Sequence, residues 1–458
     1  MPIPNIFPND NELERIRTLG KYEKLFENNQ ESVLQLHEKI KKQYKNAADL
    51  LYLSHAIPSH VSEFYGDFVQ GDSERLTIDT VLDNAQEKQM VKEIVDENDL
   101  KEKIYDYAVK QSEYGFTVLL GRVEDGKFVI EEVEQDQYFP QADGSVIFAT
   151  YLRDPHGDQP MRQRDLYLYT QHYQLVGNTV HIERRAWRTD TSQRASDAIS
   201  LAYLGITAPE DEMIQNMTML PIVQIDNGRK TRFGFGKSDY ADIMPQLAEV
   251  NERSTHVATQ LLKNLDAKLE MQDIPSLRSD DGSLKTFDYI MLPDSTSVKT
   301  RYVTNENPLL EETFKHIDRQ FQFISWVSSV PMFELLKTTR PERVESLRIH
   351  LFSAIRKTNT KRSRVVKGIR QIIQIGFEML NKTLTGTIDV QFSTVIPHDP
   401  LIEVQVEQIK VASGLSSRES AMRRLENYSQ EEAEAELERI KNEDREVGFT
   451  TNSAPPQI

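Results

Sequence analysis

The stretch GFGKSDYADIMPQLAEVNERSTHVATQLLKN occupies residues 234–264, and the rest of the chain is organised around it. Apolar side chains recur along it at steps of three, four and seven, at Ile243, Leu247, Val250, Val257 and Leu261. This spacing predicts a long amphipathic helix from Ser238 to Asn264. Proline at 245 removes a backbone donor, so we expect a kink there. Gly234 and Gly236 precede the helix as turn residues, and Ser238 is its predicted N-cap.

Upstream of this helix the pattern is mixed. Residues 12–69 carry apolar positions at helical spacing with only Pro58 interrupting, and residues 97–115 form another candidate helix that ends at Tyr114-Gly115. Short runs rich in Val, Ile, Phe and Tyr follow, at residues 116–120, 128–133, 146–152, 165–170 and 180–187. Because turn signals separate these runs, they predict an antiparallel sheet with helices packed on it.

Downstream, residues 267–304 predict a small separate unit that contains β-structure, and residues 308–329 are again helical. Breaks at Val330-Pro331 and Arg340-Pro341 precede the longest helical pattern, residues 342–380. A strand is expected at 387–395. Two Ser-x-x-Glu capping boxes, beginning at Ser416 and Ser429, predict two short helices near the end.

Composition excludes several classes of protein. The formal net charge of −17 argues against a surface that grips nucleic acid throughout, because phosphate binding depends on Lys and Arg. The absence of cysteine removes disulfides, thiolate metal sites and cysteine nucleophiles. No apolar run approaches the roughly 20 residues that span a bilayer, and residues 1–15 do not have the pattern of a secretory signal. We expect no membrane segment and no export.

Three groups of residues resemble a phosphate-binding, a metal-binding or a catalytic site, but each lacks the spacing that such a site requires. Gly236-Lys237-Ser238 resembles the end of a phosphate-binding loop, but the motif requires glycine where Thr231 stands. His55 and His60 lack the helical spacing of a metal pair. The carboxylates at 131, 132, 134 and 136 lie on a predicted strand, where only 132 and 134 of the first three share a face. We therefore expect no catalytic, cofactor or metal site.

The order of elements resembles the portal protein family of tailed bacteriophages. Local patterns that match the family are Gln111 to Gly115 before a strand, Leu220 to Val223, Gly234 to Asp239 at a helix start, and Ser325 to Pro331. Tyr138-Phe139-Pro140 and the stretch from Ile396-Pro397 to the acidic end also match. Lys337 to Pro341 departs from the family pattern, because many relatives have small residues between the Val-Pro break and the long helix.

The resemblance implies an α+β, mainly helical portal fold. Its expected divisions are a wing at 1–237, a stem helix at 238–264, a small α/β clip at 265–307 and a second stem helix at 308–330. A tunnel loop at 331–345, a long wing helix and strand at 346–400, a helical crown at 401–446 and a disordered tail at 447–458 complete the expectation.

The resemblance also implies a ring of about twelve copies at one capsid vertex. DNA would pass through it during packaging, retention and ejection. Its partners would be double-stranded DNA, the terminase large subunit, head-completion or adaptor proteins, and major capsid and scaffolding proteins. We expect it in the virion, and in the host cytoplasm during assembly, with ATP hydrolysis left to the terminase motor.

A basic run between 337 and 370 contrasts with the acidic chain. We expect Lys337, Arg340 and Arg343, beside the two proline breaks, to face DNA in the tunnel. The second part of the run has two interpretations, inter-subunit pairing or DNA contact, and pairing with a neighbour's carboxylates is favoured. Its residues are Arg356, Lys357, Lys361, Arg362 and Arg364.

Two other functions compete with the portal interpretation. A packaging-associated nuclease or ATPase would need a phosphate loop or paired carboxylates, which the sequence lacks. Another oligomeric virion part, such as a capsid or adaptor protein, would not explain the succession of helix, β unit and helix between Ser238 and Ser329.

Overall fold

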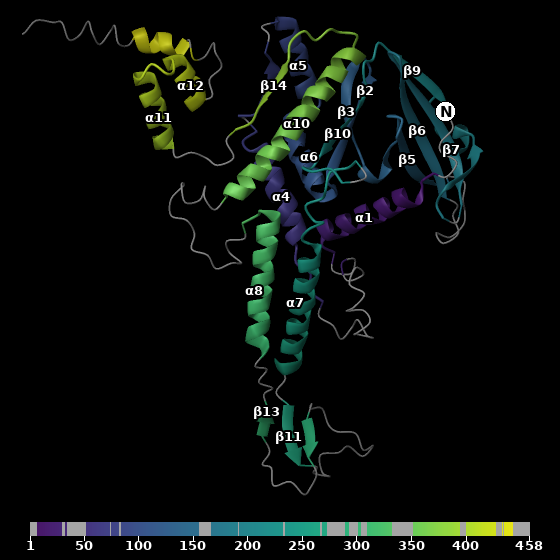
Figure 1. Cartoon of the computed structure of the whole chain (residues 1–458), viewed down its shortest axis with the longest axis vertical. Coiled ribbons are helices and arrows are strands. Elements are labelled where there is room, and N and C mark those ends of the chain that lie inside the picture. Colours follow the sequence, from purple (N-terminus) through teal and green to yellow (C-terminus); the bar gives the residue numbers. More distant parts are fainter. Residues whose placement is uncertain are drawn as a thin grey trace, which may run out of the picture. The chain divides into compact units, whose positions relative to one another are not determined.

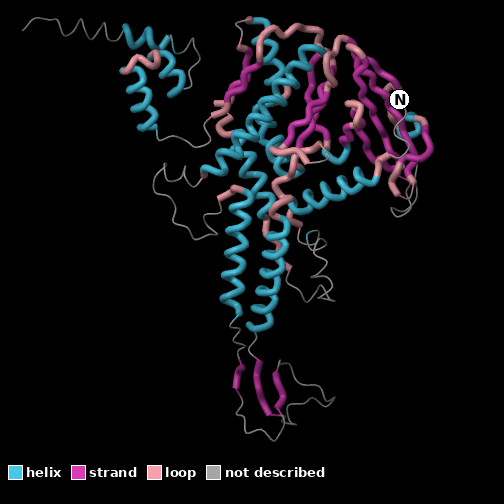
Figure 2. The backbone as a smooth tube through the Cα atoms, viewed as in Figure 1, coloured by secondary structure: helices cyan, strands magenta, loops and turns pink. Residues whose placement is uncertain are grey.

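The computed structural model describes residues 7–29, 33, 52–73, 75–81, 84–154, 166–190, 192–231, 234–265, 268–272, 289–292, 301–303, 309–331, 351–393, 400–426, 433 and 435–442. They fall into two compact units. The first holds the described residues up to Val390, apart from Gly71–Thr77, and the second holds Gly71–Thr77 and those from Gln391 onward. Helices and strands are both abundant (Figure 2), so the predicted α+β class is confirmed.

Helices α1 (Asp10–Glu27), α4 (Ile57–Gln70), α5 (Ala85–Glu97) and α6 (Leu100–Tyr114) open the first unit. Asn9 caps α1 in a capping box with Glu12. Pro58 lies in the first turn of α4 and does not interrupt the helix, because a first-turn residue needs no intrahelical donor. Gly115 ends α6 with φ 93°, the left-handed cap that the sequence predicts.

The strands at residues 116–226 form two sheets, of three and six strands, where the sequence predicts one. The smaller has the order β10-β2-β3, and the larger has the order β4-β5-β6-β7-β8, with β9 also paired to β7. Their strands are β2 (Phe116–Glu124), β3 (Lys127–Val133), β4 (Tyr138–Pro140), β5 (Val146–Arg153), β6 (Leu166–Val176), β7 (Thr179–Thr189), β8 (Ala195–Ile199), β9 (Asp211–Gln215) and β10 (Ile222–Asp226). The short 3₁₀ turns are η2 (Gln135–Gln137) and η3 (Leu201–Leu204). Polar β8 and β9 were not predicted, since their sequences lack the apolar alternation of a half-buried strand.

The long helix α10 (Phe352–Met379) packs across the β10-β2-β3 sheet (Figure 1). It lies close to the strands because two positions that face them are glycines. A Cβ on Gly368 would stand 2.5 Å from Ile225, and one on Gly376 would stand 2.8 Å from Phe128. The sequence predicts this helix from residue 342, but residues 342–350 lie outside the described part. A two-stranded sheet of β1 (Thr77–Thr80) and β14 (Ile388–Gln391) follows it.

Helices α7 (Met244–Leu265) and α8 (Leu309–Ser328) run side by side (Figure 1). The predicted kink at Pro245 is wrong: residues 239–243 form turns, α7 begins at Met244, and the proline lies in its first turn. Between them in sequence lies a three-stranded sheet of β11 (Lys268–Gln272), β12 (Tyr289–Leu292) and β13 (Arg301–Val303). A buried core joins α7, α8 and α4, formed by Ile57, Val61, Tyr65, Leu247, Val250, Val257, Ile317, Phe321 and Ile324 among others.

The second unit contains α11 (Pro400–Ala412), α12 (Arg418–Glu426) and a helical segment at 435–442. Ser417 caps α12 by accepting a hydrogen bond from the Ser420 N–H at 3.1 Å, one residue later than the predicted cap at Ser416. Helix α11 lies in the segment 401–446 that was expected as a helical crown, although no predicted capping box marks its start. Among the described helices, none combines the length and the apolarity that a membrane crossing requires.

Candidate functional site

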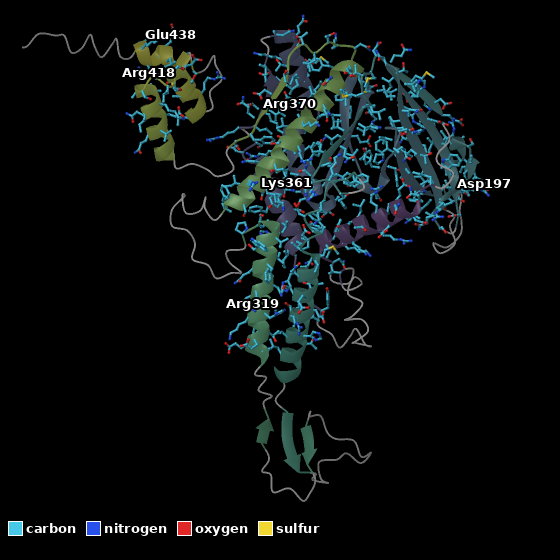
Figure 3. The ribbon with its side chains drawn as sticks, in the orientation of Figure 1. Asp197, Arg319, Lys361, Arg370, Arg418 and Glu438 are labelled. Atoms are coloured by element: carbon cyan, nitrogen blue, oxygen red, sulfur yellow. The ribbon has the colours of Figure 1, made fainter. Side chains whose placement is uncertain are left out.

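The basic residues of α10 form the candidate site that the sequence singles out. In the structure they differ in burial. Arg356 is exposed, Lys357 and Arg364 are half-buried, and Arg362 is buried. Lys361 is only 1 % exposed and lies in the interior of the unit (Figure 3). A buried ammonium group requires a carboxylate or equivalent acceptors, so its partners define the site.

Lys361 is held by three groups of its own chain. Its Nζ donates to Asp239 Oδ2 at 2.8 Å and to Asn227 Oδ1 at 2.6 Å. The same nitrogen lies 4.6 Å from the centre of the Tyr65 ring, which adds a cation–π contact. Every acceptor around this cation therefore comes from a different element: the turn before α7, the end of β10, and α4.

Lys357, one helical turn earlier on α10, binds the other oxygen of the same carboxylate. Its Nζ lies 3.0 Å from Asp239 Oδ1 and also donates to the Ser328 carbonyl at 3.1 Å. Ser328 is the last residue of α8, where helix carbonyls lack intrahelical partners. Lys357 thereby ties the end of α8 to the start of α7.

Asp239 is the centre of the arrangement. Besides the two lysines, it accepts from Ser112 Oγ at 2.7 Å and from Asn227 Nδ2 at 3.1 Å. Its own N–H donates to the Ser112 carbonyl at 2.9 Å. Burial alone would raise the pKa of Asp239, but the charges of Lys361 and Lys357 outweigh burial and hold it below its usual range.

We call these residues the junction cluster: Tyr65, Ser112, Asn227, Asp239, Lys357 and Lys361. They come from α4, α6, the end of β10, the turn before α7, and α10, and they contact the end of α8. A hydrogen-bonded charge network has one low-energy arrangement, so the cluster fixes how the two paired helices leave the sheet-containing part of the unit.

Two stretches that carried the family resemblance meet at this cluster. Gly115 and Gly236 approach so closely that a Cβ on Gly236 would stand 2.1 Å from the Gly115 carbonyl oxygen. The Asn227 N–H donates to that same carbonyl at 2.6 Å. Ser238 Oγ donates to the Glu113 carbonyl and accepts from the Tyr240 N–H at 3.0 Å. Gly115 has the left-handed cap role that the sequence predicts. Ser238 caps the turn at residues 239–243 and is not the N-cap of the long helix, because α7 begins only at Met244.

Arg362 binds the end of α4. Its guanidinium donates to the Val69 carbonyl at 3.0 Å and to the Phe68 carbonyl at 2.9 Å, both in the last turn of that helix. Burial lowers the pKa of Arg362 to about 10. This cation satisfies helix carbonyls that have no partner within the helix.

The prediction for the basic face changes accordingly. Lys361 and Arg362 are occupied within the chain, so neither is available to DNA or to a neighbouring subunit, and Lys357 is partly occupied. Arg356 and Arg364 keep accessible surface. Lys337, Arg340 and Arg343 lie outside the described residues. Sequence reasoning missed Tyr65, Ser112, Asn227 and Asp239 as partners, although Ser112 and Asp239 stand in the motifs it quoted.

Two further groups of charged and nucleophilic side chains in the described part have structural partners. On β3, Glu132 lies 3.4 Å from Lys110 while Glu131 lies 2.9 Å from Arg122, so their opposite faces are as predicted. Ser145 Oγ lies 2.9 Å from His172 Nε2 and donates to Asp143 at 2.6 Å. In a catalytic triad the carboxylate binds the imidazole, but here it binds the hydroxyl. In the described part, no three metal-ligating side chains gather.

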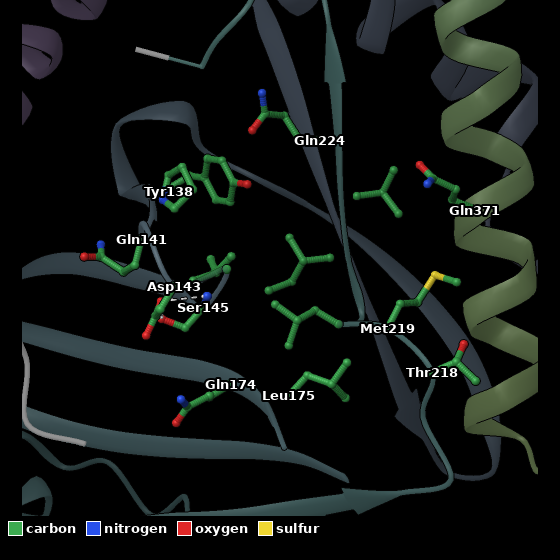
Figure 4. Close-up of a pocket in the computed structure, with 16 residues that line it drawn as sticks. Tyr138, Gln141, Asp143, Ser145, Gln174, Leu175, Thr218, Met219, Gln224 and Gln371 are labelled. Carbon is green, nitrogen blue, oxygen red and sulfur yellow. Dashed lines mark hydrogen bonds between the residues drawn. The ribbon is translucent and has the colours of Figure 1, made fainter. Parts of the chain in front are cut away.

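A groove of about 660 Å³ opens between the β10-β2-β3 sheet and the six-stranded sheet that contains β4, β5 and β6 (Figure 4). We call it the inter-sheet groove. It is lined by residues from 138–146 at β4 and β5, Gln174 and Leu175 of β6, residues from 218–224 at β10, and Gln371 of α10. Thr218 at its edge is fixed to α10, because its N–H and hydroxyl donate to Glu378 at 2.8 and 2.6 Å.

Comparison with protein families finds a match over part of the chain. Residues 282–448 match the model of the phage portal protein family described as SPP1 Gp6-like. The predicted resemblance to the portal family is confirmed over these residues. Among solved structures, a chain from "Virion of native gene transfer agent (GTA) particle" is similar to this chain, with 10 % identity, a TM-score of 0.43, and coverage of 82 % of this chain and 91 % of that one.

A second structure, "Neck of native GTA particle computed with C12 symmetry", has 12 % identity, a TM-score of 0.41, and coverage of 81 % and 89 %. No protein with a curated description matches this chain.

Proposed function

We propose that this protein is the portal subunit of a tailed phage or a related particle. A closed ring of about twelve copies would form the channel through which duplex DNA is packaged, retained and ejected. The observation that carries the proposal is the portal-family match over residues 282–448, a range that includes α8 and α10. The succession of α7, a three-stranded sheet and α8 agrees with the stem and clip that the family resemblance implies.

Uncovered aromatic side chains on α8 support assembly into a ring. Phe314, Phe323 and Trp326 are all exposed in the single chain, and Trp326 is 77 % exposed. Phe314 and Phe323 are nine residues apart, which places them on opposite sides of the helix. A ring requires two different contact surfaces on each copy, one for each neighbour, and apolar groups on opposite sides of α8 meet that requirement.

The junction cluster has a mechanical role in this proposal. It fixes α7 and α8 to the sheet-containing part of the unit through the half-buried Lys357 and through Lys361 and Asp239, which are buried and therefore inaccessible to DNA. The channel surface would carry few cations, since a dense basic lining would bind phosphates and slow DNA movement. Arg356 and Arg364, which remain accessible, would pair with carboxylates of a neighbouring copy.

The remaining partners follow from the family. The segment that contains β11–β13 would dock the terminase motor during packaging and the head-completion proteins afterwards, with capsid and scaffolding proteins meeting the wing. Lys337, Arg340 and Arg343 would face the DNA. Replacing these three by glutamine should leave rings intact and reduce DNA packaging or retention. Normal yields of filled heads would show that these residues have no role in either process.

Loss of the protein tests the proposal directly. Particles assembled without it should contain no packaged DNA, while shells still form, and supplying the wild-type chain should restore filled heads. Filled heads in its absence would contradict the proposal.

Purified protein should hydrolyse neither ATP nor DNA, because the described residues form no phosphate loop, catalytic triad or metal cluster. Hydrolysis that a single substitution abolishes would favour a packaging enzyme.

A further inference from the structure

The inter-sheet groove is bounded by the free edge of β10. In the three-stranded sheet β10 pairs only with β2, and among the described residues no strand covers its other side. The Gly121 N–H donates to Pro221 O and the Asn227 N–H donates to Gly115 O. Because bonded pairs alternate in an antiparallel ladder, Val223 and Ile225 face β2, and the backbone groups of Ile222 and Gln224 point away from it.

An uncovered edge of this kind is unusual. Exposed strand edges are normally blocked by charged side chains, a proline or a bulge, since their unpaired N–H and C=O groups attract another strand. Pro221 precedes this edge and Asp226 ends it, but Ile222, Val223 and Gln224 between them include none of these features, and all three line the groove. The edge is also held in place, because Thr218 is fixed to Glu378 of α10.

The lining of the groove fits a peptide backbone. Its apolar residues Leu175, Met219 and Leu220 accompany the amide side chains of Gln141, Gln174, Gln224 and Gln371 (Figure 4). Asp143 is the one carboxylate of the lining, and its Oδ1 already accepts from the Ser145 N–H and hydroxyl. Amides donate to and accept from peptide groups, so this surface selects for an extended uncharged segment rather than for an ion.

We propose that the inter-sheet groove receives an extended, uncharged segment of a neighbouring copy, which adds as a strand to the free edge of β10. This inference rests on the proposed ring. In a closed head-to-tail ring, each copy contacts its two neighbours through two different surfaces. The groove of every copy can therefore bind the same segment of the next copy. A groove with a single, already engaged carboxylate also admits a second chain of net charge −17 without strong repulsion.

A photo-crosslinking experiment on assembled rings tests the proposal. The full chain carries p-benzoylphenylalanine at Met219 in the groove or, as a control, at Met213, which is 63 % exposed on β9 and outside the groove. After irradiation of rings, mass spectrometry should find a crosslink from Met219 to one peptide of a neighbouring copy. Rings that form normally but yield no such crosslink, or a crosslink only to a different protein, would overturn the inference.

A proline substitution tests the strand addition itself. Gln224→Pro removes an outward N–H and leaves the β2–β10 ladder intact, because residue 224 does not donate to β2. Ring formation by this variant should need about five- to ten-fold more protein than Gln224→Ala, provided that both monomers melt normally. Equal assembly of the two folded variants would contradict strand addition. Wild-type protein that forms no rings at all would instead refute the proposed function, and this inference with it.

Discussion

Lys361 Nζ lies 2.8 Å from Asp239 Oδ2, and both side chains are buried in the centre of the first unit. Lys357 binds the second oxygen of the same carboxylate at 3.0 Å, so one anion serves two cations. The positions of α7, α8 and α10 relative to one another depend on this arrangement. Replacing the shared carboxylate should therefore lower the free energy of unfolding more than replacing one of the two lysines.

Replacing Asp239 by asparagine should destabilise the protein strongly. The change leaves Lys361 buried without a carboxylate and Lys357 without its ion pair, and breaking a buried pair in this way costs about 3–5 kcal/mol. Thermal or urea unfolding measures the loss. Asp242→Asn is the matched control, because its pair with Lys237 is half-exposed and surface pairs contribute about 0–1 kcal/mol. Equal losses for the two variants would refute the role of Asp239.

Replacing Lys361 by methionine should cost less than replacing Asp239. Methionine fills much of the same volume, and the remaining carboxylate still has Lys357 and the Ser112 hydroxyl as partners. We expect the free energy of unfolding to fall by about half as much as in Asp239→Asn. A double-mutant cycle in urea measures the coupling between the two residues, and additive effects would show that the pair contributes nothing.

Stability at acid pH should depend on Asp239. Its pKa is lower in the folded chain than in the unfolded chain, so its contribution is complete above about pH 4 and decreases as the pH falls further. The difference in unfolding free energy between the wild type and Asp239→Asn should therefore shrink below pH 4. A difference that stays constant from pH 7 to pH 3 would contradict the ion-pair account.

Glu113 should behave in the opposite way. Burial, reinforced by the charge of Glu23, raises its pKa to about 7, although a hydrogen bond with Tyr114 opposes this. Because the folded state holds this proton more tightly, the residue costs stability as the pH rises from about 4.5 to 7. Glu113→Gln should thus stabilise the protein at pH 8 by roughly 1–3 kcal/mol and have little effect at pH 4. Glu131→Gln, on the exposed face of β3, serves as the control.

Trp326 should contribute to assembly and not to folding of the single chain. Trp326→Ala removes a large exposed apolar surface, so ring formation should weaken by about ten-fold or more while the melting temperature of the monomer stays nearly constant. Leu415→Ala, at an 81 % exposed position in the second unit, should leave assembly unchanged. Native mass spectrometry over a concentration series distinguishes these outcomes, and unimpaired assembly by Trp326→Ala would remove α8 from the contact.

Local patterns predicted many of the elements, because helix spacing, turn glycines and Val-rich runs report on neighbouring residues. Gly115 and the strands β2, β3, β5, β6 and β7 are examples. The limits of α7 were wrong at its start, since residues 239–243 follow the packing of Asp239 against Ser112 rather than helical periodicity.

The partners of the α10 cations could not be predicted in the same way. Lys361 and Arg364 look alike in the sequence, and only their position on the helix, one facing Asp239 and the other toward the surface, separates them. Asp239 and Asn227 are brought to Lys361 from 122 and 134 residues away. Residue spacing along the sequence does not predict contacts over such separations. The family resemblance singled out Gln111 to Gly115 and Gly234 to Asp239, but it did not show that Ser112 and Asp239 bind each other.

The oligomeric state of the purified protein tests the central claim most directly. Negative-stain electron microscopy combined with native mass spectrometry should show closed rings of about twelve copies with an axial channel. A protein that stays monomeric at every concentration, and also in the presence of its capsid and scaffolding partners, would contradict the portal account.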